Sequence, residues 1–470
     1  MIIKNESASK IHLGFTSQSG TTLEPGETTE VSDELSLNSS FVAAKDAGVI
    51  SVVSYDDSDD SYVAQKELKD LVATTVDTSA PTIPVGPTRD IATLADGIAL
   101  LDDSYFRNGV TFQVDSGIYP DSVSLSAKVP DKISIIGDNT RSLAGYHWKN
   151  GLNNYYWPPS YAGSGTISIT NSGNEIIVTC GTTNPDFVSG GIVAGDKVIT
   201  LNTAGATAEY ELANAIDNRL ILTTTAPSMT GDTGFFIAPN VQLGNLSISG
   251  PREINLEGVY FKDKRLFISY SDYVVYQNIC TFSSTFNFYS FSYIKNLYGG
   301  RYTSAGKQST TIGFCNNVYI WDSLFLDDGT TTFSDLKAEY IDRFLPEWID
   351  IVAKAGPLGK VGVWAEYIGY ILANYGCRVK NLAYPLFYQG VKNGYSWGDI
   401  VDTGQYGIWC AGATMYLDGP TVQNQSVQGI RAENKSLITV ASPTLSGNAQ
   451  DYSPAVSGTE GNNDSIIVHP

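Results

Sequence analysis

The sequence predicts an all-β protein whose chain coils into a solenoid of stacked turns. Charged residues make up only 17% of the chain, and much of the remainder is Gly, Ser, Thr, Asn and Tyr. This composition suits many short strands joined by tight turns. Alternating apolar runs, as in GVTFQV (109–114) and KISII (132–136), indicate strands with one buried face. They return at roughly 20-residue intervals, which in a β-patterned chain is typical of a solenoid.

The repeat also predicts which residues meet between turns. Phe112 and Val114 align with Ile133 and Ile135 at an offset of 21 residues (133 − 112). After residue 250 a polar residue repeatedly precedes an apolar strand, at Asn278, Asn296, Asp322, Asn381, Asp399 and Asp418-Gly419. A second series is 22 residues apart (429 − 407), at Gly407-Ile408 and Gly429-Ile430. Asn, Asp and Gly tolerate left-handed backbone, so we expect the polar positions to form corners of the coil.

The first 87 residues predict two small segments that precede the solenoid. Over 1–60, the runs IHLGF, TTEVS and GVISVVSYDD indicate strands of a small β module. Over 61–87, apolar residues at helical spacing indicate a short helical neck, followed by a Pro-rich linker. A helix this short is marginal alone, and three copies winding together would stabilise it. The acidic run DDSDD (56–60) lacks the ligand spacing of a calcium loop and is expected to be solvated.

Residues 88–159 are expected to hold a capping helix, the first turns of the solenoid and a loop. Asp90 is the predicted N-cap of a helix over 91–103, whose apolar residues form one stripe. The segment YHWKNGLNNYYWPPSY (146–161) lies outside the repeat and carries six aromatic residues beside Asn side chains. We therefore expect this segment to be a loop.

Two further segments interrupt the repeat. Residues 160–242 contain hairpin-forming strands with their own turns, and they predict an inserted small β domain before the main solenoid of 243–470.

The second interruption has a helical pattern. Apolar residues from Leu336 to Phe344 lie at helical spacing, and Thr332 with Asp335 fits a capping box. Pro346 would begin a second helix, so the sequence predicts a helical excursion near 332–356.

Three motifs resemble the first turns of pectin-lyase-like right-handed parallel β-helices. DIATLADGIALL resembles their capping helix, GVTFQVDSGIYPDSVSL a first turn ending in Gly and Tyr, and KISIIGDN the turn that ends in IIGDN. The resemblance covers residues 88–141 and 250–450. Together with the N-terminal module, neck and linker, the layout resembles a phage tailspike or tail fibre.

This resemblance implies a homotrimer in the virion tail. Residues 1–60 would bind a phage tail or baseplate protein, and the β-helix would meet a host surface glycan or another receptor. The chain stops at DSIIVHP soon after the last predicted turn, so the neck and the β-helix flanks are expected to hold the trimer.

Charge and composition disfavour several other functions. The net charge of −20 repels nucleic acid and anionic membranes. No stretch approaches the length needed to span a bilayer, and the N-terminus has no signal-peptide pattern. The five widely spaced cysteines are expected to be buried free thiols, consistent with assembly in the host cytoplasm. The three histidines lack metal-ligand spacing, so neither a metal nor a cofactor is expected.

Tailspike-like β-helices often cleave surface polysaccharide, so the resemblance implies that a pair of carboxyl groups could be catalytic. Glycoside hydrolysis needs two of them roughly 5–9.5 Å apart. The candidates are Asp399, Asp402, Asp418, Glu366, Asp327 and Asp328. Asp399 and Asp418 are 19 residues apart (418 − 399), which would place them on neighbouring turns. A lyase would instead need a base such as Arg301, Arg378 or Lys380. Solvated turn carboxylates are the alternative interpretation, because none of the candidates lies in a distinctive motif.

Aromatic clusters indicate sugar binding, because rings stack on the C–H faces of sugars. The candidates in the loop are Tyr146, Trp148, Tyr155, Tyr156 and Trp157, and those in the later turns are Tyr395, Trp397, Tyr406 and Trp409. Packing or a trimer interface is the alternative role for both sets.

Three functions remain open at this point. The first is a receptor-binding tail spike or fibre, and the second is a spike with polysaccharide-degrading activity. The third is a cellular polysaccharide-modifying enzyme, which the N-terminal module and neck disfavour. The weak evidence for an acid pair favours binding.

Overall fold

The computed structural model describes most of the chain. Its described residues are 2–9, 11–12, 22–30, 48–54, 81–103, 109–125, 131–141, 143–147, 154–156, 167–180, 184–283, 289–306, 310–329, 334–353, 358–453 and 465–468. Of these residues 68% lie in strands, and α3 (Leu94–Asp103) is the single α-helix among them. Within these ranges the protein has no helix with the length and apolar character that crossing a bilayer requires.

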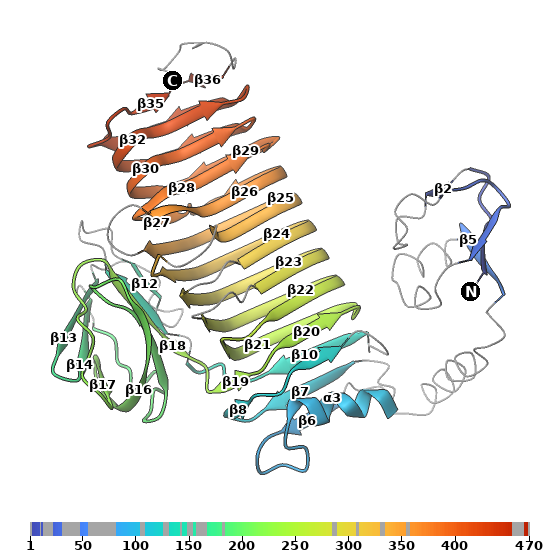
Figure 1. Ribbon diagram of the computed structural model, residues 1–470, viewed down its shortest axis with the longest axis horizontal. Helices are drawn as coiled ribbons and strands as arrows, with labels where there is room; N and C mark the ends of the chain where they lie inside the picture. Colours follow the sequence, from blue (N-terminus) through green and yellow to red (C-terminus); the bar gives the residue numbers. More distant parts are fainter. Residues whose placement is uncertain are drawn as a thin grey trace.

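The main body is a parallel β-solenoid of about 13 turns, stacked from α3 to β36 in Figure 1. Val274, Leu297 and Val318, for example, pair in parallel on three successive turns. The predicted parallel β-helix is therefore confirmed. Its strands are β6 (Thr82–Val85), β7 (Val110–Val114), β8 (Gly117–Tyr119), β9 (Val123–Leu125), β10 (Lys132–Ile136), β19 (Val241–Leu243), β20 (Leu246–Ser249), β21 (Glu253–Lys262), β22 (Leu266–Ser283), β23 (Tyr289–Gly306), β24 (Thr310–Asp327), β25 (Ser334–Ala353), β26 (Leu358–Ala373), β27 (Arg378–Lys380), β28 (Leu382–Gln389), β29 (Asn393–Trp397), β30 (Ile400–Ala411), β31 (Thr414–Asp418), β32 (Thr421–Glu433), β33 (Leu437–Ala441), β34 (Thr444–Ser446), β35 (Tyr452–Ser453) and β36 (Ile466–Val468).

Each turn has three strand segments separated by corners, so the solenoid has three flat faces. In β22, residues 266–269 lie in sheet A, 273–277 in sheet B and 279–283 in sheet C. Corner 1, between sheets A and B, is Tyr270 in this turn, and corner 2, between sheets B and C, is Asn278. Both residues have left-handed backbone, with φ of 56° and 54°. Corner 3 leads from sheet C to sheet A of the next turn.

Alternate residues point into the solenoid, where their apolar side chains form one continuous core. Ile268, Val274 and Ile279 supply one fully buried side chain from each sheet of the same turn. Burying a side chain of this size stabilises the fold by about 1.5–3 kcal/mol, so each turn is held by its contacts with the turns on either side. All five cysteines are buried with free thiols, as the sequence predicts.

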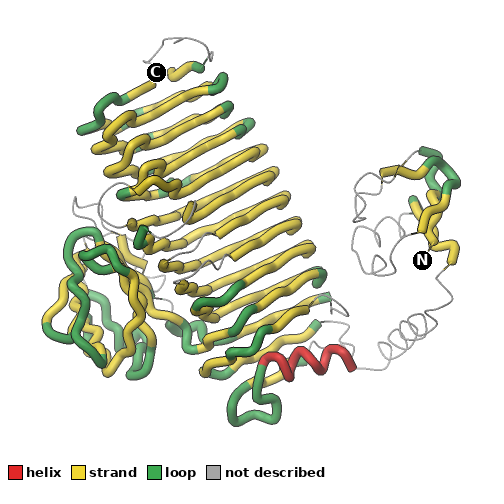
Figure 2. Tube along the Cα trace, in the orientation of Figure 1, coloured by secondary structure: helices red, strands yellow, loops and turns green. Residues whose placement is uncertain are grey.

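A second β domain, the insert, interrupts the solenoid between β10 and β19. Its eight strands pair in the order β12-β11-β18-β15-β16-β17-β14-β13 around a separate apolar core. Figures 1 and 2 show it lying against one side of the solenoid. The strands are β11 (Ala144–His147), β12 (Asn154–Tyr156), β13 (Ile167–Ser172), β14 (Glu175–Cys180), β15 (Lys197–Leu201), β16 (Thr207–Ile216), β17 (Arg219–Leu222) and β18 (Thr233–Ala238).

The insert packs on the outer face of sheet C. Tyr146, Leu201 and Phe236 of the insert form a buried apolar cluster with Leu324 and Val352 of the solenoid. Ion pairs and hydrogen bonds also cross this seam. They join Glu209 to Lys262 and Tyr260, Thr207 to Asp328, and Asp232 to Lys380 and Asn381. The outer face of sheet C is thus an internal interface over these turns.

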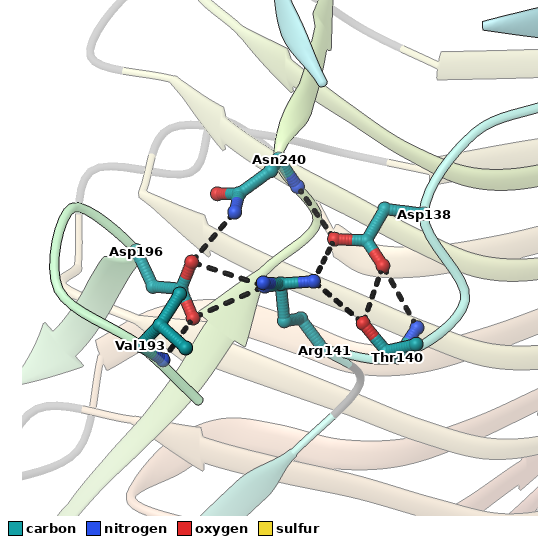
Figure 3. A network of polar contacts seen from close by, with 6 residues as sticks. All are labelled: Asp138, Thr140, Arg141, Val193, Asp196 and Asn240. Carbon is teal, nitrogen blue, oxygen red and sulfur yellow. Dashed lines mark hydrogen bonds and ion pairs between the residues drawn. The ribbon is translucent and has the colours of Figure 1, made fainter. Parts of the chain in front are cut away.

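A polar network fastens the start and the end of the insert to the loop that follows β10 (Figure 3). Arg141 donates to Asp138 at 2.8 Å and to Asp196 of the insert at 3.0 Å. Asn240, where the chain returns to the solenoid, donates its side chain to Asp196 at 2.6 Å. Asp138 also accepts two bonds from Thr140. The polar end of KISIIGDNTR therefore anchors an inserted domain as well as ending a strand.

The predicted helical excursion near 332–356 is wrong for the residues that the structure describes. Residues 334–353 form β25, which pairs in parallel with β24 and β26. Tyr340 and Trp348 have φ of 53° and 55° and form corners 1 and 2. Each corner adds one residue between inward positions, so Ala338 and Ile341 are three apart and both buried. Spacings of two and three residues combined imitate the helical period.

Three smaller predictions also need correction. The first turns pair Val110 with Ile133 and Phe112 with Ile135, an offset of 23 (133 − 110) instead of 21. A shift of two residues keeps every side chain on its face, so the alternating pattern could not reveal it. The N-cap of α3 is Thr93, whose side chain bonds with the amide and the carboxylate of Asp96. The third concerns the segment at 146–161, whose described parts lie in β11 and β12 and pair with each other and with β18.

The polar series after residue 250 mixes different parts of the turn. Asn278 and Asp322 both lie at corner 2, whereas Asn381 lies at corner 3 and Asn296 within sheet B. The second series is confirmed, because Ile408 pairs with Ile430.

The described part of residues 1–60 contains short antiparallel strands. β1 (Ile2–Asn5) pairs with β4 (Thr28–Glu30) and β5 (Ile50–Ser54), and β2 (Ile11–His12) pairs with β3 (Thr22–Leu23). The predicted helical neck lies outside the described residues.

Candidate functional site

Corner 1 carries a ladder of five aromatic rings on successive turns. Neighbouring rings are stacked with centroids 4.9–5.2 Å apart, and every ring is between 45% and 56% exposed. The corner 1 ladder consists of Tyr270, Tyr293, Phe314, Tyr340 and Tyr367. Because the rings cover one another, the inner three present edges to solvent and have no free face for a sugar to stack on.

Corner 2 carries a shorter row of rings with a different geometry. Trp348 stacks on Tyr375 with centroids 4.5 Å apart, and Tyr375 meets Trp397 edge-on at 5.7 Å. Tyr375 is 43% exposed and Trp397 is 45% exposed. On the turn beyond Trp397, Gly419 occupies the corner and leaves the indole uncovered by another ring. This corner 2 ridge, defined as Trp348, Tyr375 and Trp397, therefore ends in an accessible aromatic face.

Carboxylates line the ridge on its sheet B side. Glu347 pairs with Trp321 on the previous turn and accepts hydrogen bonds from Tyr319 at 2.8 Å and Asn374 at 3.0 Å. Asp418 pairs with Trp397 and accepts a bond from Tyr395 at 3.3 Å. The ridge thus runs beside two partly exposed acids that are held in place by neutral donors.

Asp322 lies at corner 2 one turn before Trp348. Burial raises the pKa of the Asp322 carboxyl, Arg301 opposes that shift, and Glu347 adds to it. Glu347 and Asp322 lie one turn and one residue apart, roughly 6 Å between Cα atoms from ideal strand spacings. Two neighbouring carboxyl groups, one of which has a raised pKa, match the acid and partner of a glycosidase.

A buried ion pair supports the ridge from below. Arg378 donates a hydrogen bond from Nη2 to Asp350 at 2.6 Å, and its Nε lies 2.5 Å from the other carboxylate oxygen as an ion pair. Its guanidinium lies 5.1 Å from the ring centroid of Trp348. The ring centroid of Tyr146, from the insert, lies 6.0 Å from the same guanidinium. The insert therefore helps to fix the base of the ridge.

A small cavity lies where the insert meets corner 2. It measures about 10 Å³, close to the space one water needs, and is lined by Leu143, Ala144, Ile237, Cys280, Arg301, Thr303 and Asp322. Burial lowers the pKa of Arg301 and raises that of Cys280 to about 12, so this thiol stays protonated and unreactive.

Sheet A carries a third aromatic group on its outer face. Trp364, Phe387 and Trp409 contact one another on successive turns, with Lys337 over the first ring and Arg431 over the last. A cation therefore covers the ring at each end of this row. This platform therefore resembles a closed packing unit more than an open sugar site.

The platform is flanked by a pair of carboxylates. Lys337 contacts Glu339 at 2.5 Å and Glu366 at 3.3 Å, so the two carboxylate oxygens are no more than 5.8 Å apart (2.5 + 3.3 Å). Both carboxylates are already engaged by the ammonium of Lys337, so this pair belongs to the packing of the platform.

The structure separates the predicted catalytic residues. Asp399, Asp402 and Asp327 are buried, so a polysaccharide has no direct access to their carboxylates. Each has a structural partner: Asp399 accepts the amide of Cys377, Asp402 pairs with Lys380, and Asp327 accepts the amide of Gly329. Asp328 bonds Thr207 of the insert, Glu366 lies on sheet A, and Asp418 lies beside the ridge. The catalytic role of these six residues stays a prediction. Burial disfavours this role for Asp399, Asp402 and Asp327.

The predicted sugar-binding residues divide in the same way. Tyr146 is fully buried in the seam, which contradicts a direct contact with a glycan. Trp148 and Trp157 lie outside the described residues, and Tyr155 and Tyr156 belong to β12. Trp397 belongs to the ridge and Tyr395 lies two residues before it on the same strand of sheet B. Tyr406 and Trp409 lie at the platform of sheet A, in contact with Arg431.

Sequence reasoning missed Trp348, Tyr375, Asp322 and Glu347 as site residues. Trp348 and Glu347 lie in the segment assigned to a helix, and Asp322 was assigned to a structural corner. The ridge residues are 27 and 22 positions apart (375 − 348 and 397 − 375), so no constant period aligns them.

Comparison with known proteins finds similar solved structures but no family. No protein-family model and no curated protein matches the sequence. The tailspike gp61 of Pseudomonas phage phi297 has 11% identity and a TM-score of 0.25, over 81% of this chain and 76% of that chain. The tailspike gp49 of Pseudomonas phage LKA1 has 10% identity and a TM-score of 0.20, over 86% and 75%. The Gp54 tailspike of Acinetobacter baumannii bacteriophage AP22, in complex with A. baumannii capsular saccharide, has 9% identity and a TM-score of 0.24, over 86% and 75%. Function is therefore argued from this chain's own residues.

Proposed function

We propose that this protein is a phage tail spike that attaches the virion to its host by binding surface polysaccharide along the corner 2 ridge. The observation that carries the proposal is the open face of Trp397, held beside Tyr375 on a rigid stack of turns. Aromatic faces bind sugars by burying C–H surface at low entropy cost. The resemblance of residues 88–141 and 250–450 to pectin-lyase-like β-helices, together with the tailspike-like layout of the N-terminal module, neck and linker, supports the same function.

The remaining parts follow the same resemblance. Residues 1–60 would attach to a tail or baseplate protein, and the chain would act as a homotrimer in the virion tail after assembly in the host cytoplasm. A mass in solution near that of one chain would contradict the trimer.

Binding by the ridge is tested with a Trp397→Ala variant. A Trp side chain buries up to ~250 Å², so the 45% that is exposed offers about 110 Å² for contact. Covering half to all of it stabilises a complex by about 1.4–2.8 kcal/mol, which is roughly a 10- to 100-fold change in affinity.

The assay measures binding of immobilised protein to a panel of bacterial capsular and lipopolysaccharide glycans. We expect wild type to bind at least one glycan and Trp397→Ala to bind it at least 10-fold more weakly. Tyr270→Ala, at one end of the corner 1 ladder, is the matched aromatic control and should bind like wild type. Absence of any binding, or a loss with Tyr270→Ala alone, would contradict the proposal.

A second candidate function, glycoside hydrolysis, is favoured by one observation. Asp322 is an acid with a raised pKa next to Glu347, and both lie where a glycan on the ridge would pass. Asp322 would protonate the departing oxygen, and Glu347 would act as nucleophile or base. Incubation with a bound glycan should release oligosaccharides, and Asp322→Asn and Glu347→Gln should stop the release while binding persists. If wild type binds a glycan but releases no oligosaccharides from it, glycoside hydrolysis is contradicted.

A further inference from the structure

We infer that the glycan bound by the ridge is uncharged where it passes Trp397, and that a polyuronate is rejected there. The inference rests on the proposed function, since it names the class of glycan that the same site would take. The supporting observation is the distribution of charged side chains around the ridge.

The acids beside the ridge face the position that a bound sugar would occupy. Glu347, Asn374, Trp397 and Asp418 follow one another in a single column on the outer face of sheet B. Both acids in this column are partly exposed, and a sugar stacked on Trp397 would lie next to Asp418. A uronate carboxylate in that position would meet like charge.

The nearest cations are already committed to protein carboxylates. Arg378 is buried and held to Asp350 by a hydrogen bond from Nη2 and an ion pair at Nε. Arg301 is largely buried beside Asp322, and the loss of hydration lowers its pKa. Neither guanidinium offers free donors to an added anion at the ridge, because each faces an acid of the same site.

The exposed cations of sheet B lie at its opposite edge. Lys295, Arg343 and Lys392 lie two or three residues after corner 1, where the chain enters sheet B. Arg343 precedes Glu347 by four residues, which is roughly 13 Å along a strand. This separation exceeds the Debye length of about 8 Å at physiological ionic strength, so these cations do not offset the acids of the ridge. The net charge of −20 also opposes the approach of a polyanion.

Neutral hydrogen-bonding groups complete the surface. Asn374 is exposed between the two acids, and Tyr395 lies on the same face one turn farther on. Amide, hydroxyl and carboxylate groups suit sugar hydroxyls, which both donate and accept hydrogen bonds. The ridge therefore matches a neutral polysaccharide in shape and in charge.

The test compares each uronate-containing oligosaccharide with its own carboxyl-reduced form. A reduced sugar keeps the ring and linkage but lacks the charge, so the ratio of the two affinities isolates the electrostatic effect. With ~4.8 Å between turns, a uronate at Trp397 would lie about 5 Å from Asp418 and about 10 Å from Glu347, and in water their combined repulsion changes affinity by roughly 10-fold. Wild type should therefore bind the reduced form about 10-fold more tightly at low salt, with a smaller ratio at high salt.

Asp418→Asn should reduce that ratio to about a quarter, because it removes the nearer of the two acids. Asp217→Asn, at an exposed turn of the insert, is the matched charge control and should leave the ratio unchanged. Equal or tighter binding of the uronate form, still weakened by Trp397→Ala, would overturn the inference and leave the proposed function intact. Failure to bind either form of any pair would overturn both.

Discussion

Phe314 offers a direct test of whether the left-handed corners are strained. Its φ is 57°, and its ring lies 5.0 Å from that of Tyr293 and 4.9 Å from that of Tyr340. Left-handed backbone costs a non-Gly residue ~1–2 kcal/mol, and each aromatic pair contributes ~0.5–1.5 kcal/mol. Phe314→Ala removes both pairs and keeps the strain, so we expect a loss of about 1–3 kcal/mol.

Phe314→Gly removes the same two pairs but also relieves the strain. The relief of ~1–2 kcal/mol is partly offset by ~0.4–1 kcal/mol from the greater freedom of Gly in the unfolded chain. The Gly variant should therefore be about 0.5–1 kcal/mol more stable than the Ala variant. Hydrogen exchange of the amides in β24 measures this difference as a local opening free energy.

Tyr298 is the matched control for this comparison. It is 38% exposed on sheet B and is not among the residues with positive φ. Tyr298→Gly should consequently be about 0.4–1 kcal/mol less stable than Tyr298→Ala, the reverse of the order at Phe314. The same order at both positions would refute the reasoning about strain.

Two further predictions concern buried charges. Burial raises the pKa of Asp399 to about 6, above the usual value near 3.9, so the folded protein retains a proton that the unfolded chain releases. The stability from this group is present below about pH 4 and is lost as pH rises through about 6. Asp399→Asn should weaken the dependence of the thermal midpoint on pH between pH 4 and 7. An unchanged dependence would contradict the raised pKa of Asp399. Lys380→Met removes the ammonium between Asp232 and Asp402, so we expect a loss of about 3 kcal/mol and faster proteolysis of the insert. Lys392→Met, exposed on sheet B, is its control and should be neutral.

The sequence is sufficient to predict the parallel β-helix because alternation and recurrence survive small errors of alignment. Phe112 and Ile135 were assigned to the correct, inward face although their partners were displaced by two residues. What alternation does not determine is the length of each turn. Tyr270 to Tyr293 spans 23 residues, whereas Phe314 to Tyr340 spans 26. Residues that stack across turns therefore cannot be aligned by a constant period.

The sequence did not reveal the ridge because the turns differ in length. In addition, left-handed corners accept more residue types than Gly, Asn and Asp. Gly, Asn and Asp were expected at corners, yet Tyr340 and Trp348 occupy them in the middle of one strand. Stacking on the adjacent turns offsets much of the backbone cost, since ~0.5–1.5 kcal/mol per pair is comparable with ~1–2 kcal/mol of strain. Such stacking appears only when three-dimensional neighbours are known.

The stacking of equivalent turns makes the height of the ridge adjustable in fixed steps. Trp348 lies on the turn of β25, six turns beyond that of β7, which at ~4.8 Å per turn is roughly 30 Å. Within the solenoid each turn contacts only its neighbours, so duplicating the turn of β7, which precedes the insert, would move the insert and the ridge together by ~4.8 Å without redesigning either. The reach of such a protein would thus change by counting turns, while its recognition surface evolved separately.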